Sequence, residues 1–261
     1  MTGCRRTDSS RPAQASGSTG AVDSVIPSGP YGDAVRRGRA LLTATRDSLP
    51  RHVGNRLRCT SCHLDAGRRE TGSWVGVVAR YPQYRPRSGV VETIEYRVND
   101  CFRRSMNGIA LDPAGSDMRD IIAYFAFLSR GVPVAPPGGG ATTRLQKWAG
   151  FTADTAAGAR VFAATCAKCH GAMGEGTAGA PPLWGPESYN VGAGMTRVRT
   201  AAEFISRNMP FDTPGTLTDS QAFNVAGYVN AHPRPDFRGK ENDWPNGDPP
   251  PDVAYPTRSH H

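Results

Sequence analysis

The sequence predicts a mainly α-helical chain that consists of two similar domains in tandem. A five-residue cysteine–histidine motif occurs twice, each copy stands between two short helical patterns, and a proline- and glycine-rich stretch separates the copies. A length of 261 residues suits two small domains. The 30 glycines and 22 prolines argue against long helical bundles and coiled coils, so short elements joined by long loops are expected.

The net charge of +8 comes mainly from arginine, since only Lys147, Lys168 and Lys240 are lysines. Proteins that read nucleic acid usually combine a basic stripe with a recognisable motif, whereas here acidic residues are scattered among the arginines. No nucleic-acid partner is therefore expected. Small anions fit better, because a planar guanidinium binds an oxyanion through two parallel hydrogen bonds. The longest apolar run, residues 121–128, is far shorter than the roughly 20 residues that span a bilayer.

The repeated motif, Cys-x-x-Cys-His, is typical of covalent c-type heme attachment. Its first copy contains Cys59, Cys62 and His63, and its second copy contains Cys166, Cys169 and His170. The two thiols lie about one helical turn apart, so both can reach the vinyl groups on one edge of a porphyrin, and the histidine follows as an axial ligand of the iron. A redox dithiol needs no such histidine, and a zinc site needs four ligands. The sequence therefore predicts two covalently bound heme c groups.

A helix is predicted before each motif. Residues 35–42 precede the first copy, and residues 158–162 precede the second with the same spacing from a glycine to a bulky apolar residue. Gly38 and Gly158 occupy the matching positions. Because glycine has no side chain, each could permit a close crossing with another helix.

A closing helix is predicted after each motif. The first has Ser116 as its N-cap, continues to Leu128 and is ended by Gly131. The second starts with a capping box formed by Thr218 and Gln221. The sequence thus repeats the order helix, motif, long loop and closing helix.

This repeated order is the layout of two tandem class I c-type cytochrome domains. Tyr124 and Tyr228 occupy similar places on the two closing helices, which strengthens the repeat. The expected division of the chain is a flexible N-terminal segment at 1–30, a first domain at 31–131, a linker at 132–150, a second domain at 151–232 and a proline-rich tail at 233–261.

A low-spin heme needs a second axial ligand, and the identity of that ligand strongly influences the reduction potential. In the second domain, Met173 is too close to His170 to reach the opposite heme face, and Met195 lies in a glycine-rich stretch. Met209 is the preferred ligand, because it lies 39 residues after His170 and shortly before the closing helix. Packing in the core is the alternative for any single methionine.

In the first domain, a cysteine occupies the matching place. Cys101 lies 38 residues after His63, which is almost the same spacing. A thiolate ligand favours Fe(III) and lowers the reduction potential, whereas a thioether favours Fe(II). Two alternatives stay open, namely that Cys101 is an inert buried thiol or that it is disulfide-bonded to Cys4, with Met106 as the ligand. The repeat spacing argues against both.

Around these residues the sequence resembles the diheme thiosulfate dehydrogenases, bacterial periplasmic enzymes that couple two thiosulfates into tetrathionate. The resemblance covers most of the chain from about residue 50 onward. It rests on both Cys-x-x-Cys-His motifs and on the segments 81–89, 91–93, 97–108, 208–210 and 234–245. The segment around Cys101 is the most specific of these, and the order and spacing of the others add to it.

The resemblance implies a substrate pocket at the first heme, which His63 and Cys101 would ligate. Arg87 and Arg97 would bind the anion there, and Ser105 would lie close by. Because thiosulfate is a dianion, joining two of them requires charge-assisted hydrogen bonds that offset their repulsion. A further hypothesis is that the Cys101 sulfur leaves the iron and bonds to the sulfane sulfur of the first thiosulfate. A solvated surface charge or a contact to a heme propionate is expected instead for Arg85, Arg103 and Arg104.

The second heme, ligated by His170 and Met209, would pass electrons to an external acceptor such as a small cytochrome or an iron–sulfur protein. Some family members carry a lysine directly before the methionine and exchange ligands with redox state. Asn208 stands at that position here, so no such exchange with lysine is expected. The reaction could also run in reverse, as tetrathionate reduction.

Two other functions compete with this one. The first is a diheme cytochrome that only transfers electrons, and the second is a sulfur-oxidation cytochrome that attaches thiosulfate to a carrier protein. All three are expected in the periplasm.

No signal peptide is visible, which suggests a processed or recombinant form. Residues up to Cys4 resemble the end of a lipoprotein signal, so Cys4 is expected to be either a lipid-anchored residue or a stray cysteine, and the sequence fits both equally well. His260 and His261 resemble the start of an affinity tag.

Overall fold

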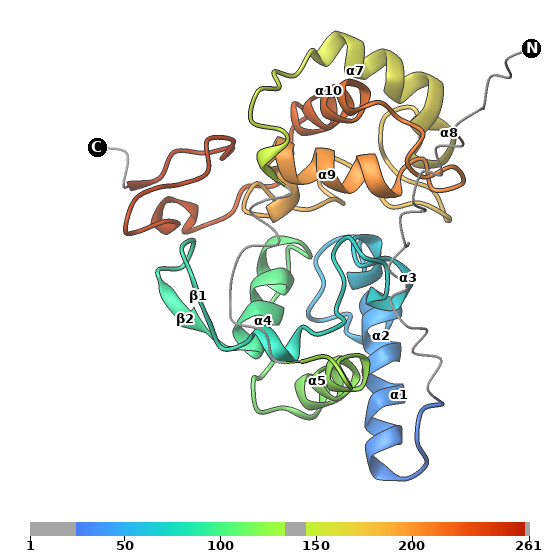
Figure 1. The fold of residues 1–261 in the computed structure, drawn as a ribbon, viewed down its shortest axis with the longest axis vertical. Helices are drawn as coiled ribbons and strands as arrows, with labels where there is room; N and C mark the ends of the chain where they lie inside the picture. Colours follow the sequence, from blue (N-terminus) through green and yellow to red (C-terminus); the bar gives the residue numbers. More distant parts are fainter. Residues whose placement is uncertain (1–24, 134–144, 259–261) are drawn as a thin grey trace, which may run out of the picture.

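A computed structural model describes residues 25–133 and 145–258, and Figure 1 shows two helical halves, one above the other in the view. The mainly α-helical class predicted from the sequence is confirmed. Cys4, most of the expected linker and the two final histidines lie outside the described residues. Within the described ranges, no helix combines the length and the apolar character that a membrane span requires.

The first half contains helices on both sides of the first Cys-x-x-Cys-His motif. Its elements are α1 (Pro30–Thr43), α2 (Thr45–Ser48), η1 (Cys59–Ser61), α3 (Leu64–Gly67), η2 (Val78–Arg80), β1 (Gln83–Arg85), β2 (Val90–Glu92), α4 (Ile94–Arg104) and α5 (Ser116–Leu128). β1 and β2 form an antiparallel hairpin in which Gln83 faces Glu92. Ser116, predicted as the N-cap of α5, is instead its first residue, because Gly115 has the extended backbone of an N-cap.

The second half repeats this plan around the second motif. Its elements are α7 (Thr155–Val161), the π-helical turn η3 (Phe162–Cys166), α8 (Ala167–His170), η4 (Gly194–Thr196), α9 (Val198–Asn208) and α10 (Asp219–Asn230). The predicted capping box at the start of α10 is confirmed. The amide of Gln221 donates to the Thr218 hydroxyl at 3.2 Å, and the Thr218 amide donates to the Gln221 side chain at 2.9 Å.

A glycine allows the first and last helices of each half to cross closely, as predicted. A Cβ atom on Gly38 of α1 would lie 1.9 Å from the carbonyl oxygen of Asp120 in α5. A Cβ atom on Gly158 of α7 would lie 2.2 Å from the carbonyl oxygen of Asn224 in α10. Real Cβ atoms do not approach other atoms so closely. Only glycine therefore fits these two crossings.

The two halves are joined by a loop of the second half that lies along the first. The buried carbonyl oxygen of Ser188 accepts hydrogen bonds from the side-chain amides of Asn55, at 3.0 Å, and Asn107, at 2.7 Å. The amide of Arg56 donates to the Glu187 carbonyl at 3.1 Å. Because a buried polar atom without a partner is costly, these bonds restrict how the halves can move relative to each other.

Residues 233–258, called the tail below, contain η5 (Lys240–Asn242) and contact both halves. The tail lies beside the β1–β2 hairpin in Figure 1. On the hairpin side, the Trp244 amide donates to the Arg87 carbonyl at 2.8 Å. On the side of the second half, the Val191 amide donates to the Pro235 carbonyl at 2.9 Å. The tail therefore packs across both halves.

The crossing of α1 and α5 yields a stability prediction. Gly38→Ala should lower the free energy of unfolding of the holoprotein by about 1–3 kcal/mol, because the added methyl group forces the helices apart. Gly150→Ala is the matched control, since a Cβ atom on Gly150 would meet nothing within 4 Å. Denaturant unfolding followed by far-UV circular dichroism measures both variants. Equal stability of the two variants would contradict this account of the crossing.

Candidate heme and anion site

The histidine of each motif is held in the orientation that metal binding requires. The Nδ1 atom of His63 lies 2.5 Å from the Gly72 carbonyl oxygen, and the Nδ1 atom of His170 lies 2.8 Å from the Pro181 carbonyl oxygen. Burial lowers the pKa of both rings, which favours the neutral imidazole. A neutral ring that donates from Nδ1 presents the lone pair of Nε2 to a metal. Both histidines therefore fit the role of axial heme ligand.

Aromatic residues support the two motif regions in related ways. His63 stacks on Trp74, with 4.9 Å between the ring centroids. Tyr124 meets Trp74 edge-on at 6.2 Å, and Tyr228 meets Trp184 edge-on at 5.9 Å in the other half. The matching places predicted for the two tyrosines are thus confirmed.

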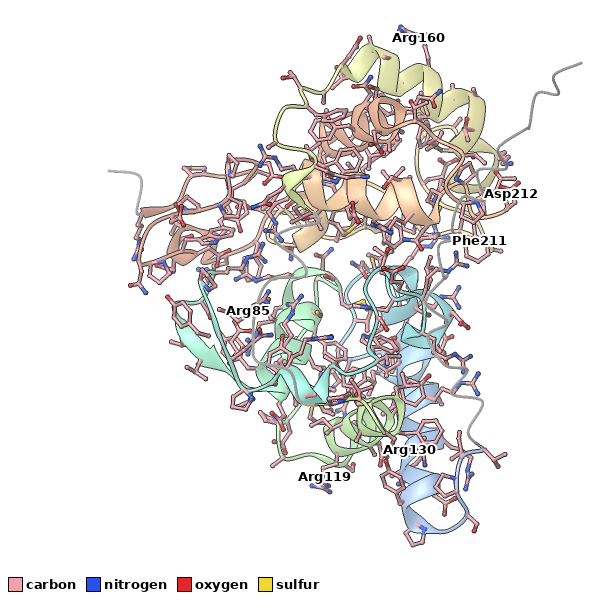
Figure 2. All side chains as sticks on the ribbon, in the orientation of Figure 1. Arg85, Arg119, Arg130, Arg160, Phe211 and Asp212 are labelled. Carbon is pink, nitrogen blue, oxygen red and sulfur yellow. The ribbon has the colours of Figure 1, made fainter. Side chains whose placement is uncertain are left out.

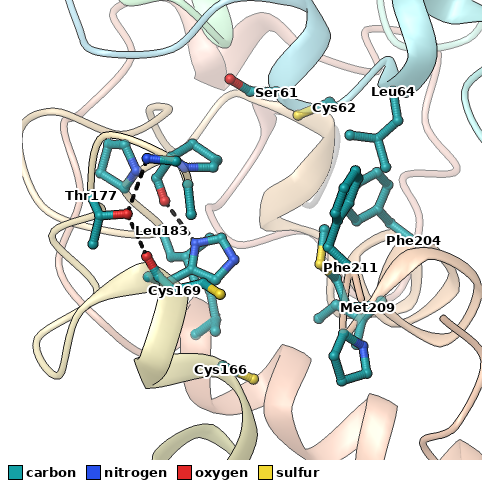
Figure 3. Close-up of a pocket in the computed structure, with 18 of the residues that line it drawn as sticks. Ser61, Cys62, Leu64, Cys166, Cys169, Thr177, Leu183, Phe204, Met209 and Phe211 are labelled. Carbon is teal, nitrogen blue, oxygen red and sulfur yellow. Dashed lines mark hydrogen bonds between the residues drawn. The ribbon is translucent and has the colours of Figure 1, made fainter. Parts of the chain in front are cut away.

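A cavity of about 460 Å³ lies next to the second motif (Figure 3). Cys166 and Cys169 stand on one side of it, and Met209 stands on the opposite side. His170 also lines the cavity. Two thiols, an oriented imidazole and a thioether around one mostly apolar space are the donor set of a heme c, so the residues fit this cofactor. The cavity excludes one candidate for the second axial ligand of this heme. Met209 and Met195 line the cavity, whereas Met173 is exposed and does not line it.

The first motif faces the same cavity from the other half. Cys62 and Leu64 lie along its far wall in Figure 3. The two attachment motifs are therefore neighbours across the interface between the halves. This proximity could not be read from the sequence, in which more than a hundred residues separate the motifs.

Cys101 lies on α4, close to the first motif. Burial, and then the charge of Cys101, raise the pKa of Cys62 to about 12. Burial also raises the pKa of Cys101 itself, and the Arg97 guanidinium opposes that rise. The alternative ligand, Met106, is 3% exposed and packs in the hydrophobic core of the first half. The alternative disulfide would involve Cys4, which lies outside the described residues.

The two arginines predicted to bind the anion both act on Cys101. The charge of Cys101 is the largest cause of the raised pKa of Arg97, whose Nη1 atom donates to Asp100 at 3.0 Å. Arg87 donates from Nη1 to the Gly192 carbonyl at 2.9 Å, and burial lowers its pKa to about 10. The structure therefore brings Arg87 and Arg97 together around the thiol.

Ser105 lies at the C-terminal end of the same helix. Its amide donates to the Cys101 carbonyl at 2.8 Å, so the two residues are one helical turn apart. Its carbonyl accepts a hydrogen bond from the Asn55 side chain at 2.8 Å. The closeness of the Ser105 side chain to the bound anion stays a prediction.

The solvated surface charge expected for Arg104 is wrong, whereas the alternative, a contact to a heme propionate, stays a prediction. The Arg104 side chain is only 11% exposed and forms ion pairs with Asp100 at 2.5 Å and Asp243 at 2.7 Å, so it is not a solvated charge. Arg103 on the same helix is exposed, as expected. Arg85 lies near α4 in Figure 2, and its charge lowers the pKa of Cys101. It therefore adds to the positive charge around the thiol.

Sequence reasoning missed a further arginine that the second half contributes. The Nε atom of Arg197 is buried without a hydrogen-bond partner. Burial lowers the pKa of Arg197, and the charges of Arg85 and Arg97 lower it further. Such coupling means that these guanidinium groups lie near one another. In the sequence, Arg197 stands out only by its position directly before helix α9, and that position does not indicate that Arg197 lies near the other arginines.

Comparisons with known proteins agree with this geometry. Residues 52–134 match the family described as SoxA/TsdA, cytochrome c domain, and residues 153–229 match the family described as cytochrome C oxidase, cbb3-type, subunit III. The thiosulfate dehydrogenase of Psychrobacter arcticus is 42% identical over 88% of this chain and 72% of its own length. The thiosulfate dehydrogenase of Allochromatium vinosum is also 42% identical, over 84% of this chain and 85% of its own length.

A solved structure, the thiosulfate dehydrogenase TsdBA of Marichromatium purpuratum, superposes with a TM-score of 0.72 at 38% identity. The match covers 82% of this chain and 49% of that chain, so this chain spans about half of TsdBA. Both halves are therefore cytochrome c domains, and such domains carry covalently bound heme c. On its sequence, its fold and the donor sets of its two motifs, the chain belongs to the thiosulfate dehydrogenase family of c-type cytochrome enzymes.

Proposed function

We propose that this protein oxidises thiosulfate and couples two thiosulfates into tetrathionate. One heme c would be attached in the domain at 31–131, with His63 and Cys101 as axial ligands, and the other in the domain at 151–232, with His170 and Met209. The observation that carries the proposal is the placement of Cys101, a half-buried thiol near a heme-attachment motif. The charges of Arg97 and Arg87 lower the pKa of this thiol, and the charge of Asp100 raises it.

Electrostatics supports an anionic substrate at Cys101. Arg87 and Arg97 lie around the thiol, and Arg197 adds a buried Nε–H group without a partner. Two thiosulfates bring four negative charges together. Fixed guanidiniums in a site of low polarity offset that repulsion more effectively than mobile water would, because they need no reorganisation during the reaction.

Cys101 can act as a sulfur nucleophile. Its thiolate and the sulfane sulfur of one thiosulfate form an S–S bond with the release of two electrons. When bound, the two hemes accept those electrons, one each. A second thiosulfate then attacks the sulfane sulfur of the adduct, and the Cys101 thiolate leaves with the electron pair of the broken bond. The product is tetrathionate, no proton is taken up or released, and the reverse sequence would reduce tetrathionate.

The second heme site suits electron exit. The motifs of the two halves line one cavity, so electrons would have a short path from the first site to the second. The acceptor would be a small cytochrome or an iron–sulfur protein. Oxidised sulfur substrates and covalent heme attachment support a periplasmic location.

The first prediction concerns the thiol. Cys101→Ser should retain both covalent hemes but form no tetrathionate, because the nucleophilic sulfur is lost. Anaerobic mixing with thiosulfate, with heme reduction followed by absorbance and tetrathionate assayed, measures the effect. Met106→Leu is the control, since it conserves volume in the core and should leave activity and the thiolate spectrum unchanged. Activity in Cys101→Ser, or its loss in Met106→Leu alone, would refute the assignment.

The second prediction concerns the anion contact. Arg97→Gln should lower kcat/KM for thiosulfate by about 10- to 100-fold, since a hydrogen bond to a charged group contributes about 1.5–3 kcal/mol. Arg103→Gln removes an exposed charge from the same helix and should change kcat/KM by less than about 3-fold, which is the usual range for exposed charges. Steady-state assays at two salt concentrations compare them. Equal losses in both variants would indicate a general charge effect rather than a specific contact.

The third prediction concerns the covalent step. Protein treated with thiosulfate and an oxidant, then digested with trypsin without reductant, should carry a thiosulfate adduct on the peptide of residues 98–103, which contains Cys101. Mass spectrometry of that peptide detects the adduct, and a thiol reductant should remove it. An unmodified peptide during turnover would exclude Cys101 as the nucleophile.

A further inference from the structure

The tail contributes a buried carboxylate to the region of Cys101. Asp243 is 4% exposed. Its two oxygens accept hydrogen bonds from Nη1 and Nη2 of Arg104, both at 2.7 Å, and from the Tyr255 hydroxyl at 2.5 Å. Two parallel bonds between a guanidinium and a carboxylate fix both distance and orientation. Asp243 therefore determines where the Arg104 side chain lies.

Arg104 passes this constraint on to the residue next to Cys101. Its Nε atom donates to Asp100 at 2.5 Å, and the same carboxylate accepts a bond from Arg97 Nη1 at 3.0 Å. The Asp100 carboxylate, which is mostly buried, therefore pairs with both arginines. The result is a chain of ion pairs from the tail to the anion-binding guanidinium.

The Arg104 side chain has little freedom to leave this arrangement. Its guanidinium lies 4.3 Å from the ring centroid of Phe237, another residue of the tail. Gly192 lies against both groups, since a Cβ atom there would be 2.8 Å from the Phe237 ring and 3.0 Å from Arg104 Nη1. Hydrogen bonds and packing thus hold the guanidinium on several sides.

The tail also holds the second anion-binding arginine. The Trp244 amide donates to the Arg87 carbonyl at 2.8 Å, and the Trp244 ring lies 5.0 Å from the Arg87 guanidinium. The Nε atom of Arg87 lies 3.9 Å from the Asp243 carboxylate. One short segment of the tail thus contacts Arg87 directly and Arg97 through two intermediates.

We propose that Asp243 is a positioning residue for the reaction at Cys101: through Arg104 and Asp100 it holds the Arg97 guanidinium, and directly it holds the Arg87 guanidinium, in the places where they bind the anion. This inference rests on the proposed function. Asp243 itself need not touch the substrate. Its side chain acts because a misplacement of about 1 Å in a substrate-binding group can reduce a rate by about 100-fold.

The test compares two tail variants of the holoprotein. Asp243→Asn should lower kcat/KM for thiosulfate by about 10- to 100-fold, because one amide cannot accept both Arg104 bonds. Asp236→Asn is the matched control. It makes the same chemical change seven residues earlier, where the carboxylate is 72% exposed and forms an ion pair with Lys240, and it should leave kcat/KM within about 2-fold. Assays are run well below the unfolding midpoint of each variant.

A second readout separates positioning from a general loss of structure. In the oxidised holoprotein, electron paramagnetic resonance should show altered g values for the thiolate-ligated heme in Asp243→Asn and unchanged g values for the other heme, which serves as the internal reference. The hydrogen bonds and charges near the sulfur set that signal. If the variant only loosened the tail, the unfolding midpoint would fall while both signals and kcat/KM stayed at their original values, and the inference would be overturned.

A double-variant cycle tests the route through Arg104. If Asp243 acts through Arg104, then Arg104→Gln combined with Asp243→Asn should lower kcat/KM no further than the more severe single variant. If the double variant instead loses kcat/KM by the product of the two single losses, Asp243 does not act through Arg104.

Should Asp243→Asn not fold, Tyr255→Phe is the substitute, because it removes one hydrogen bond to Asp243 without changing charge. A loss in kcat/KM of about 3-fold or more supports the inference, and an unchanged kcat/KM opposes it. If the wild type itself forms no tetrathionate, the proposed function fails, and the resonance comparison still decides the role of Asp243.

Discussion

The burial of like charges around Cys101 is the constraint on which the rest of the structure depends. Burial lowers the pKa of both Arg87 and Arg197, which shows that these cations are held where water solvates them poorly. A buried cation is tolerated only beside an anion or a strong acceptor. The tail supplies an anion to each, since the Asp243 carboxylate lies 3.9 Å from Arg87 and the charge of Asp252 opposes the lowering of the pKa of Arg197. The first domain, the loop of the second domain and the tail must therefore meet around α4.

The two domains share a scaffold but provide different chemistry. In both, a glycine lets two helices cross closely, and a backbone carbonyl orients the histidine of the attachment motif. They differ in the sulfur that lies near the motif. The first domain places the half-buried thiol of Cys101 near its motif, whereas the second places the thioether of Met209 across a cavity from its motif. In the proposed function, one scaffold would support two hemes of different potential, one suited to react with sulfur anions and the other to pass electrons on.

The interface between the domains holds them in a fixed orientation and also brings residues of each domain to the site of the other. Hydrogen bonds from Asn55 and Asn107 to the Ser188 carbonyl hold the domains in register, and the same arrangement brings Cys62 to the wall of the cavity beside the second motif. It also brings Arg197 from the second domain toward the anion site of the first. The site at Cys101 is therefore a property of the whole chain, and neither domain alone contains all of its charged groups.

Short-range patterns in the sequence were sufficient for the scaffold and the cofactor. The attachment motifs, the glycines at the two helix crossings and the capping box at Thr218 depend on residues within a few positions of one another, so spacing rules predict them. The same rules placed the N-cap of α5 at Ser116, one residue too late, because the extended backbone of Gly115 decides where α5 begins.

The charged network, in contrast, was decided only by the tertiary structure. Arg104 was expected to be a surface charge or to contact a heme propionate, yet it pairs with Asp243, which is 139 residues away in the chain. No local pattern marks two residues that meet through the packing of a tail. The sequence by itself determined the helices, the attachment motifs and the cysteine that faces the first of them. Tertiary structure decided which arginines surround that cysteine, because ion pairs between distant segments form only after hydrophobic packing has brought those segments together.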